Sequence, residues 1–272
     1  MLFYFFKPSI LQLEPTNDCN RNCKICMRGN SRKKVGYLAF ENFMKLPLTK
    51  FKEIAFHGWG EPLLHPNLFK MIKYAKSLGL KTSLITNGVI LERKLEEIFS
   101  SGLDELAFGV YTLQGNAKVL ENISRLVEEK RERRSNLKIY IDITIFSENI
   151  TEIPEIVKIG NDVGVNAIIL HRIFNLHDKS IEYISKEEEK KLFGKIKKIK
   201  GIKVYFPPKK HEVPCRVIKK CVYVTWDCKQ SPCCFLCEMG YVFETPPEKI
   251  IDRHMEFIRE MRKNEICKNC FW

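Results

Sequence analysis

Six short runs rich in β-branched and aromatic residues alternate with amphipathic segments over residues 9–205, and this alternation most limits the folds open to the chain. Strands that alternate with helices in this way form a parallel sheet covered by helices. The expected strands are residues 10–16, 53–58, 81–87, 105–111, 138–146 and 167–173. The expected helices lie near residues 40–46, 67–78, 91–100, 117–134, 151–163 and 186–199. Six βα units predict an α/β fold, a partial TIM barrel of the (β/α)6 type.

Local signals mark where these helices and the barrel end. Gly79, Gly102 and Gly164 each follow an apolar-periodic stretch, as expected of residues that close a helix in the left-handed conformation. A last strand at 201–208 ends in two prolines, which cannot continue a strand or a helix. We therefore expect a barrel over residues 1–208 and a small cysteine-rich C-terminal domain over 209–272, with one clear helix at 248–263.

The eleven cysteines are distributed unevenly. Three lie within residues 19–26, none between 27 and 214, and eight between 215 and 270. The chain shows no secretory signal, and thiols of cytoplasmic proteins are kept reduced, so this pattern favours metal binding in the cytoplasm over disulfides. A disulfide-rich protein of a heat-adapted organism is the alternative. The distribution predicts two metal regions.

The first region is a C-x3-C-x2-C loop, formed by Cys19, Cys23 and Cys26 directly after the first expected strand. A [4Fe–4S] cluster usually has four thiolate ligands, so three of them leave one iron open. A catalytic zinc site with three thiolates is the alternative. The loop falls at the carboxyl end of a strand, where barrel enzymes place their active sites.

A glycine-rich turn follows the second expected strand and so opens on the same end of the barrel. It consists of Gly58, Trp59, Gly60, Glu61 and Pro62. Glycines let backbone groups approach a ligand without obstruction by side chains. Beside the cysteine loop, this turn is a candidate cradle for a small polar ligand.

Together these motifs resemble the radical S-adenosylmethionine (SAM) superfamily. Its cluster loop matches Cys19, Cys23 and Cys26, and its GGEP-type motif matches Gly58 to Pro62, with Trp59 where glycine is usual. The run Thr86-Asn87-Gly88 after the third strand is similar to a further signature of the superfamily.

The resemblance implies an enzyme in which the three thiolates hold a [4Fe–4S] cluster and SAM chelates its open iron. Gly58, Trp59, Gly60, Glu61 and Asn87 are then expected to contact the cofactor. Reductive cleavage of SAM would give a 5′-deoxyadenosyl radical that abstracts hydrogen from a substrate. Such an enzyme needs a small reductant protein such as ferredoxin or flavodoxin.

The C-terminal cysteines resemble the SPASM or twitch extension of these enzymes, which binds auxiliary [4Fe–4S] clusters. Cys215 and Cys233 have the matching spacing if Cys228 stands where glycine is usual, and Cys267 and Cys270 supply the later C-x2-C pair. We expect at least one auxiliary cluster on these four residues. A second site on the remaining cysteines and a zinc ribbon are the alternatives; those cysteines are Cys221, Cys228, Cys234 and Cys237.

The substrate is less constrained. The run from Val224 to Cys233 resembles maturases of tungsten-enzyme cofactors and peptide-modifying enzymes, which implies a peptide, a protein or a pterin-type precursor. The net charge of +13 leaves tRNA modification as an alternative, and a non-enzymatic iron–sulfur or zinc protein is another. His57 and His171 fall near the expected barrel mouth, but structural roles are favoured for all the histidines. No apolar run is long enough to span a membrane.

Overall fold

The computed structural model describes residues 7–30, 34–174 and 180–270 of the chain. These residues form two compact units. The first comprises the described residues up to Leu84, with Ser101–Leu103 and Lys210–Cys270, and the second comprises Ile85–Ser100 and Asp104–Lys209.

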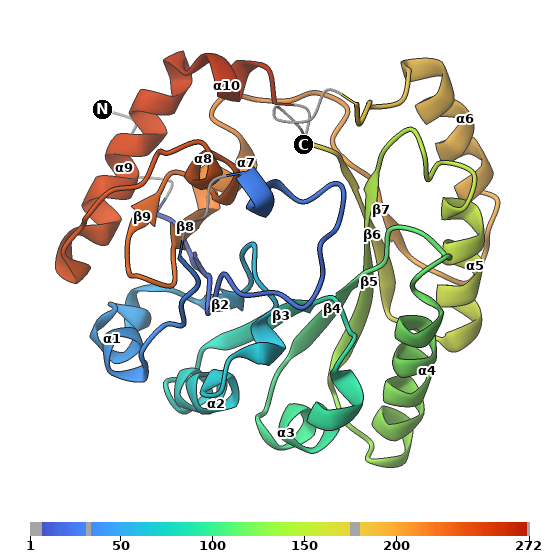
Figure 1. Ribbon diagram of the computed structural model, residues 1–272, viewed down its shortest axis with the longest axis horizontal. Helices are drawn as coiled ribbons and strands as arrows, with labels where there is room; N and C mark the ends of the chain where they lie inside the picture. Colours follow the sequence, from blue (N-terminus) through green and yellow to red (C-terminus); the bar gives the residue numbers. More distant parts are fainter. Residues whose placement is uncertain (1–6, 31–33, 175–179, 271–272) are drawn as a thin grey trace. The chain divides into compact units, whose positions relative to one another are not determined.

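Parallel strands form the centre of the first unit (Figure 1). Strand β1 (Ile10–Leu13) pairs with β2 (Glu53–Phe56), and β2 pairs with the start of β3 (Lys81–Thr86). Helices α1 (Phe40–Lys45) and α2 (Leu68–Ser77) follow β1 and β2. The buried side chains of α2 recur at helical spacing, at Leu68, Met71, Ile72 and Ala75, so one face of the helix packs into the core.

A strand from the C-terminal part of the chain completes this sheet. Strand β8 (Cys221–Val224) lies parallel to β1 with Leu11 opposite Val222, and β9 (Gln230–Ser231) runs antiparallel to β8. Val222 is fully buried, as is Leu11, and burial of each such side chain stabilises the fold by about 1.5–3 kcal/mol. The C-terminal segment is therefore built into the same sheet as the N-terminal strands.

Within the described residues, four α-helices accompany β8 and β9: α7 (Arg216–Lys220), α8 (Cys234–Glu238), α9 (Ile250–Glu260) and α10 (Glu265–Lys268). The sequence predicted α9, at residues 248–263, and that prediction is confirmed. The other helices have only four or five residues, too few for apolar periodicity to reveal them.

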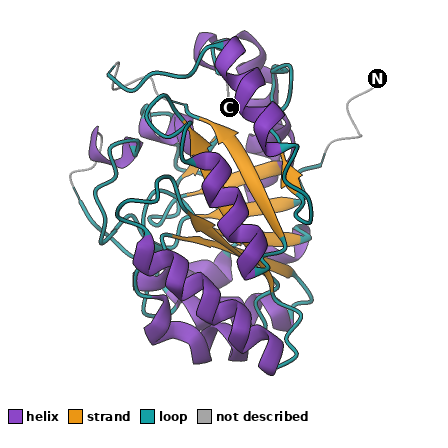
Figure 2. Cartoon of the chain, turned by 90° about the vertical axis from the view of Figure 1, so that its right-hand side faces the viewer, coloured by secondary structure: helices purple, strands orange, loops and turns teal. Residues whose placement is uncertain are grey.

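The second unit continues the alternation of strands and helices. Its strands pair in parallel in the order β4, β5, β6, β7, and α4, α5 and α6 cover one face of them (Figures 1 and 2). The elements are α3 (Leu95–Ser100), β4 (Glu105–Gly109), α4 (Ala117–Glu132), β5 (Lys138–Ile145), α5 (Ile153–Val163), β6 (Ala167–Arg172), α6 (Lys186–Ile196) and β7 (Val204–Tyr205).

The two faces of β5 differ in chemistry. Ile139, Ile141, Ile143 and Ile145 are at most 1% exposed, whereas the alternate residues of the strand stay partly accessible. Those alternate residues on the opposite face are Tyr140, Asp142 and Thr144. Inward positions of closed barrels usually carry bulky apolar side chains, so this polar, half-buried face is a candidate substrate-facing surface.

The six predicted βα units are all present, which confirms the α/β assignment. Gly79, Gly102 and Gly164 have φ values of 75°, 76° and 90°, so the predicted left-handed helix ends are confirmed. The expected strand at 201–208 is only the two residues of β7. The division into domains 1–208 and 209–272 stays a prediction; a compact unit does resume at Lys210, but it also contains β1 and β2. None of the described helices could cross a membrane.

Candidate cofactor and metal site

The cysteine loop (residues 16–28) leaves β1 and is held by hydrogen bonds that begin before its first cysteine. Thr16 Oγ1 donates to the Gly36 carbonyl at 2.6 Å, and Asn17 Oδ1 accepts the Gly36 N–H at 2.8 Å. Further along, Arg28 Nη2 donates to the Arg21 carbonyl at 2.7 Å. These bonds fix both ends of the segment that carries Cys19, Cys23 and Cys26.

The three thiols of this loop lie close enough for their charges to interact. Burial raises the pKa of the Cys26 thiol, an effect opposed by the Arg28 backbone N–H and increased by the negative charges of the Cys23 and Cys19 thiolates. Burial also raises the pKa of Cys23, with Arg21 as the largest opposing influence. The backbone N–H of Cys26 donates to the Cys23 carbonyl at 3.0 Å, which folds the loop into a turn. The structure thus brings the three predicted ligands together.

The GWGEP loop (residues 58–62) packs directly against the cysteine loop. The Glu61 N–H donates to the Asp18 carbonyl at 2.6 Å. A Cβ atom added at Gly60 would lie 2.1 Å from the Thr16 carbonyl oxygen and 2.6 Å from that of Asp18. Both neighbours are backbone atoms that cannot rotate away, so only glycine allows this approach.

A buried glutamate that the sequence analysis missed supports the GWGEP loop. Glu14 is 0% exposed, its Oε1 accepts the Trp59 N–H at 3.0 Å, and its side chain packs where a Cβ of Gly58 would lie. The signal was an ionisable residue within the apolar run Ile10–Pro15. The Glu61 carboxylate is also buried and accepts the Leu63 N–H at 3.0 Å, which gives it a capping role in the loop.

These residues fit the cofactors that the sequence predicts. Three cysteines on one short loop, none of them in a disulfide, supply the donor set of a cluster with an open iron, and the GWGEP loop packs against that loop at Gly60. Among the residues that the structure describes, no three His, Cys, Asp or Glu side chains are arranged to hold a single metal ion. A cubane differs from a single ion because each thiolate binds a different iron.

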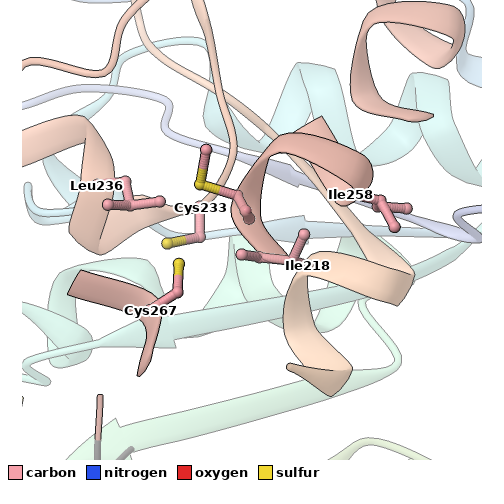
Figure 3. Packing of buried hydrophobic residues seen from close by; sticks show 6 residues of the cluster. Ile218, Cys233, Leu236, Ile258 and Cys267 are labelled. Atoms are coloured by element: carbon pink, nitrogen blue, oxygen red, sulfur yellow. The ribbon is translucent and has the colours of Figure 1, made fainter. Parts of the chain in front are cut away.

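The predicted auxiliary ligands meet in the C-terminal part of the first unit. Cys233 and Cys267 are buried in one apolar cluster with Ile218 and Leu236, and their sulfur atoms point toward one another (Figure 3). Burial, together with the negative charges of the Cys215 and Cys270 thiolates, raises the pKa of Cys267 to about 12. The structure therefore brings Cys215, Cys233, Cys267 and Cys270 into one neighbourhood, which we call the auxiliary cysteine group.

The other C-terminal cysteines have different surroundings. Cys228 has a φ of 63°, in the left-handed region where glycine is the usual residue, and its charged neighbours are Asp227, Lys45 and Glu244. Cys234 is hydrogen-bonded to Gln12 of β1 and lies near Cys221, and burial raises the pKa of Cys234 to about 12. Cys228 therefore lies apart from the auxiliary cysteine group.

Asn87, the remaining predicted cofactor contact, belongs to a turn of the second unit. Its Oδ1 accepts the Val89 N–H at 3.0 Å, and Asn122 Nδ2 donates to the Gly88 carbonyl at 2.9 Å. Gly88 has a φ of 72°, as its place in this tight turn requires. The contact between Asn87 and a cofactor stays a prediction.

Histidines in the described part of the chain have local partners. His65 is buried, accepts the Asn67 N–H through Nδ1 and lies 2.9 Å from the Leu38 carbonyl through Nε2, so its role is structural. His254 is fully buried with Nε2 2.6 Å from the Ile218 carbonyl, so its role is structural as well. His57 Nδ1 lies 3.2 Å from Gln12 Nε2.

His171 forms an ion pair with Asp142 on the polar face of β5 and β6, with a distance of 3.1 Å between Nε2 and Oδ2. Burial lowers the pKa of His171, but the charge and hydrogen bond of Asp142 outweigh this effect, and the pKa is raised overall. The pair places a charged, partly accessible group on the surface where a substrate could bind.

Comparison with known families agrees with this arrangement. Residues 13–158, more than half of the chain, match the radical SAM superfamily. The chain belongs to this superfamily. It is therefore a radical SAM enzyme, with a cysteine-rich C-terminal region that resembles the SPASM or twitch extension, and the non-enzymatic alternative is wrong.

Several relatives are enzymes that modify cofactors, nucleotides or peptides. A Pyrococcus furiosus protein, the tungsten-containing aldehyde ferredoxin oxidoreductase cofactor-modifying protein, is 26% identical over 64% of this chain and 54% of its own. A probable GTP 3′,8-cyclase of Methanocaldococcus jannaschii is 26% identical over 96% of this chain and 79% of the cyclase. The PqqA peptide cyclase of Gluconobacter oxydans is 29% identical over 43% of this chain and 34% of the peptide cyclase. The chain thus spans about half the length of the first of these relatives.

Among solved structures, Streptococcus suis SuiB bound to S-adenosylmethionine superposes with a TM-score of 0.72 at 15% identity, over 97% of this chain and 71% of SuiB. At this identity the likeness concerns the fold. It supports the predicted partial TIM barrel, (β/α)6, with a cysteine-rich C-terminal region.

Proposed function

We propose that this enzyme cleaves SAM reductively and uses the resulting 5′-deoxyadenosyl radical to take a hydrogen atom from a peptide, a protein or a cofactor precursor. The observation that carries the proposal is the contact between its two candidate cofactor loops. Gly60 and Glu61 lie against the Thr16 and Asp18 carbonyls, directly before Cys19.

In this proposal Cys19, Cys23 and Cys26 hold a [4Fe–4S] cluster, whose chemistry when bound is to deliver one electron to SAM. The chain's own residues bind and orient. The GWGEP loop, the proposed SAM cradle, packs directly against the cysteine loop because Gly60 carries no side chain. Glu14 holds this loop through the Trp59 N–H, and Arg28 holds the cysteine loop through the Arg21 carbonyl.

The auxiliary cysteine group supports a second cluster. Its four thiols come from three segments of the chain: Cys233 and Cys267 lie in one apolar cluster, Cys215 packs against that cluster, and Cys270 lies near Cys267. Four thiolates are a full ligand set for a cubane. A small reductant protein such as ferredoxin or flavodoxin is the proposed electron donor.

The class of substrate rests on the relatives. One is named for cofactor modification and one for cyclisation of a peptide, and both names suit a maturase-like enzyme. The half-buried polar face with Asp142 and His171 offers hydrogen-bonding and charged groups to such a substrate. We propose a peptide, a protein or a pterin-type precursor.

The test is anaerobic reconstitution with iron and sulfide, followed by dithionite and SAM, with 5′-deoxyadenosine measured by mass spectrometry. The wild type should form 5′-deoxyadenosine, and Cys19→Ala should fall to background because its cluster lacks one of three ligands. Cys228→Ser is the matched control, since Cys228 lies apart from both groups of predicted ligands. Product from Cys19→Ala at the wild-type rate, or no product from the wild type, would refute the proposal.

A further inference from the structure

Trp59 stands where the GGEP-type motif that this loop resembles has glycine, and its side chain contacts the C-terminal part of the chain. The indole Nε1 donates to the Cys234 carbonyl at 3.0 Å. The ring also packs against Phe235, with centroids 5.7 Å apart and planes at 63°. Cys234 and Phe235 open α8 and directly follow Cys233 of the auxiliary cysteine group. Trp59 thus joins the GWGEP loop to the segment that carries an auxiliary ligand.

A second contact joins the same two regions through β1. Gln12 is hydrogen-bonded to the Cys234 thiol, and its Nε2 lies 3.2 Å from Nδ1 of His57, the residue before Gly58. Gln12 is 5% exposed, so these contacts lie in the interior. The start of α8 is therefore attached to the GWGEP loop from two directions.

The position of α8 in turn depends on Cys233. This residue precedes α8 as its N-cap, is 9% exposed, and its carbonyl accepts a hydrogen bond from Ser231 Oγ at 2.9 Å. Leu236 of α8 lies in the apolar cluster with Cys233 and Cys267. A change in how Cys233 and Cys267 are held would therefore move or loosen the residues that Trp59 contacts.

We propose that Trp59 is a positioning residue through which the auxiliary cysteine group sets the affinity of the SAM site. The inference rests on the proposed function, because it takes the GWGEP loop as the SAM cradle. The backbone N–H of Trp59 donates to Glu14 and its indole N–H donates to the Cys234 carbonyl. A shift of Cys234 would therefore change the position of the GWGEP loop. Coupling between two sites of one protein typically changes affinity 5- to 150-fold, and one hydrogen bond with one ring contact belongs at the lower end, about fivefold to tenfold.

The test is a double-mutant cycle on SAM affinity, because coupling appears as non-additivity. Trp59→Gly removes the indole and with it the contacts to Cys234 and Phe235, and Cys270→Ala removes an auxiliary ligand without opening the apolar cluster that contains Cys267. The SAM dissociation constant is measured by calorimetry and by the change that SAM causes in the electron paramagnetic resonance signal of the reduced N-terminal cluster. The integrated intensity of that signal confirms equal loading of the N-terminal cluster in all four proteins, because total iron also changes when Cys270→Ala removes an auxiliary ligand.

Cys270→Ala should weaken SAM binding about fivefold or more when Trp59 is present and less than about twofold in Trp59→Gly. Equal weakening in both backgrounds, or none in the wild type, would overturn the proposal. Trp59→Phe, which keeps a ring but lacks the N–H donor, serves if Trp59→Gly does not fold: its coupling should be smaller than in the wild type, and undiminished coupling refutes the idea.

Phe243→Leu is a packing control. Phe243 lies in the same unit but packs on Phe257, with ring centroids 5.1 Å apart, so this variant should keep the full coupling. Loss of the coupling in Phe243→Leu would overturn the proposal, because a general loosening of the C-terminal part would then explain the effect on SAM affinity without Trp59. Formation of 5′-deoxyadenosine at saturating SAM separates the two claims: an inactive wild type refutes the proposed function, whereas an active wild type with an additive cycle refutes only the role of Trp59.

Discussion

At Gly60 the GWGEP loop packs against backbone atoms of the cysteine loop, and substitution there tests this geometry. Gly60→Ala would bring a Cβ to 2.1 Å from the Thr16 carbonyl oxygen and 2.6 Å from that of Asp18. Because the backbone must shift, we expect a loss of about 1–3 kcal/mol in the free energy of unfolding of the cluster-free protein, measured by urea denaturation. SAM binding to the reconstituted protein should weaken as well.

Gly194→Ala is the matched control. Gly194 lies inside α6, and a Cβ there meets nothing within 4 Å. Alanine in a helix interior is more stable than glycine by about 0.5–1 kcal/mol, so this variant should be slightly stabilised. A Gly60→Ala protein as stable as the wild type would contradict the close approach of the two loops.

The ion pair between Asp142 of β5 and His171 of β6 makes the stability of the second unit depend on pH. The charge and hydrogen bond of Asp142 raise the pKa of His171 against the lowering effect of burial. A histidine with a raised pKa in the folded state contributes its full stability below its unfolded pKa of about 6.5 and loses it as the pH rises through the folded value.

Asp142→Asn should therefore lower the pKa of His171, since burial remains and the carboxylate charge is gone. Histidine NMR titration measures this shift directly, and urea denaturation across the same pH range should show a smaller stability gain at low pH than in the wild type. His65, whose pKa is lowered by burial and which touches neither strand, is an internal control and should not move. An unchanged His171 titration would contradict the pairing.

Elements with strong periodicity were predictable from the sequence, and short buried elements were not. The four buried apolar residues of α2 recur at helical spacing, and apolar and polar residues alternate along β5. Both patterns are visible in the sequence. Strand β8 has four residues, Cys-Val-Tyr-Val, all partly or fully buried, and so shows no alternation to recognise. Its partner β1 lies about 210 residues away in sequence, and no local pattern encodes such a pairing.

The candidate site divides in the same way. Cysteine spacing and glycine-rich turns are local, so Cys19, Cys23, Cys26 and Gly58 to Pro62 could be identified from the sequence alone. The supporting contacts are not local: Glu14 meets Trp59 across 45 positions, and Trp59 meets Cys234 across 175. Only the folded chain reveals these contacts.

For the molecule as a whole, the net charge of +13 is weak evidence for a nucleic-acid substrate. Basic side chains on the helices of the second unit are interleaved with acids: Arg125 pairs with Glu92, and Arg133 pairs with Glu96 and Glu129. Such pairing is typical of solvated helix faces, whereas nucleic-acid sites need unpaired positive charge along one surface. The charge distribution thus favours the maturase-like proposal over tRNA modification.

Two groups of cysteines in one molecule make a prediction about total metal. Three thiols in the cysteine loop and four in the auxiliary cysteine group correspond to two cubanes, so the anaerobically reconstituted protein should hold about eight irons per chain. Cys267→Ser should reduce this to about four while 5′-deoxyadenosine formation persists, because the N-terminal cluster remains. Cys228→Ser should keep about eight, since its neighbours are Asp227, Lys45 and Glu244. Iron, sulfide and zinc analyses of the wild type, Cys267→Ser and Cys228→Ser test these values. About twelve irons per chain, or zinc in place of iron, would contradict this assignment of the cysteines.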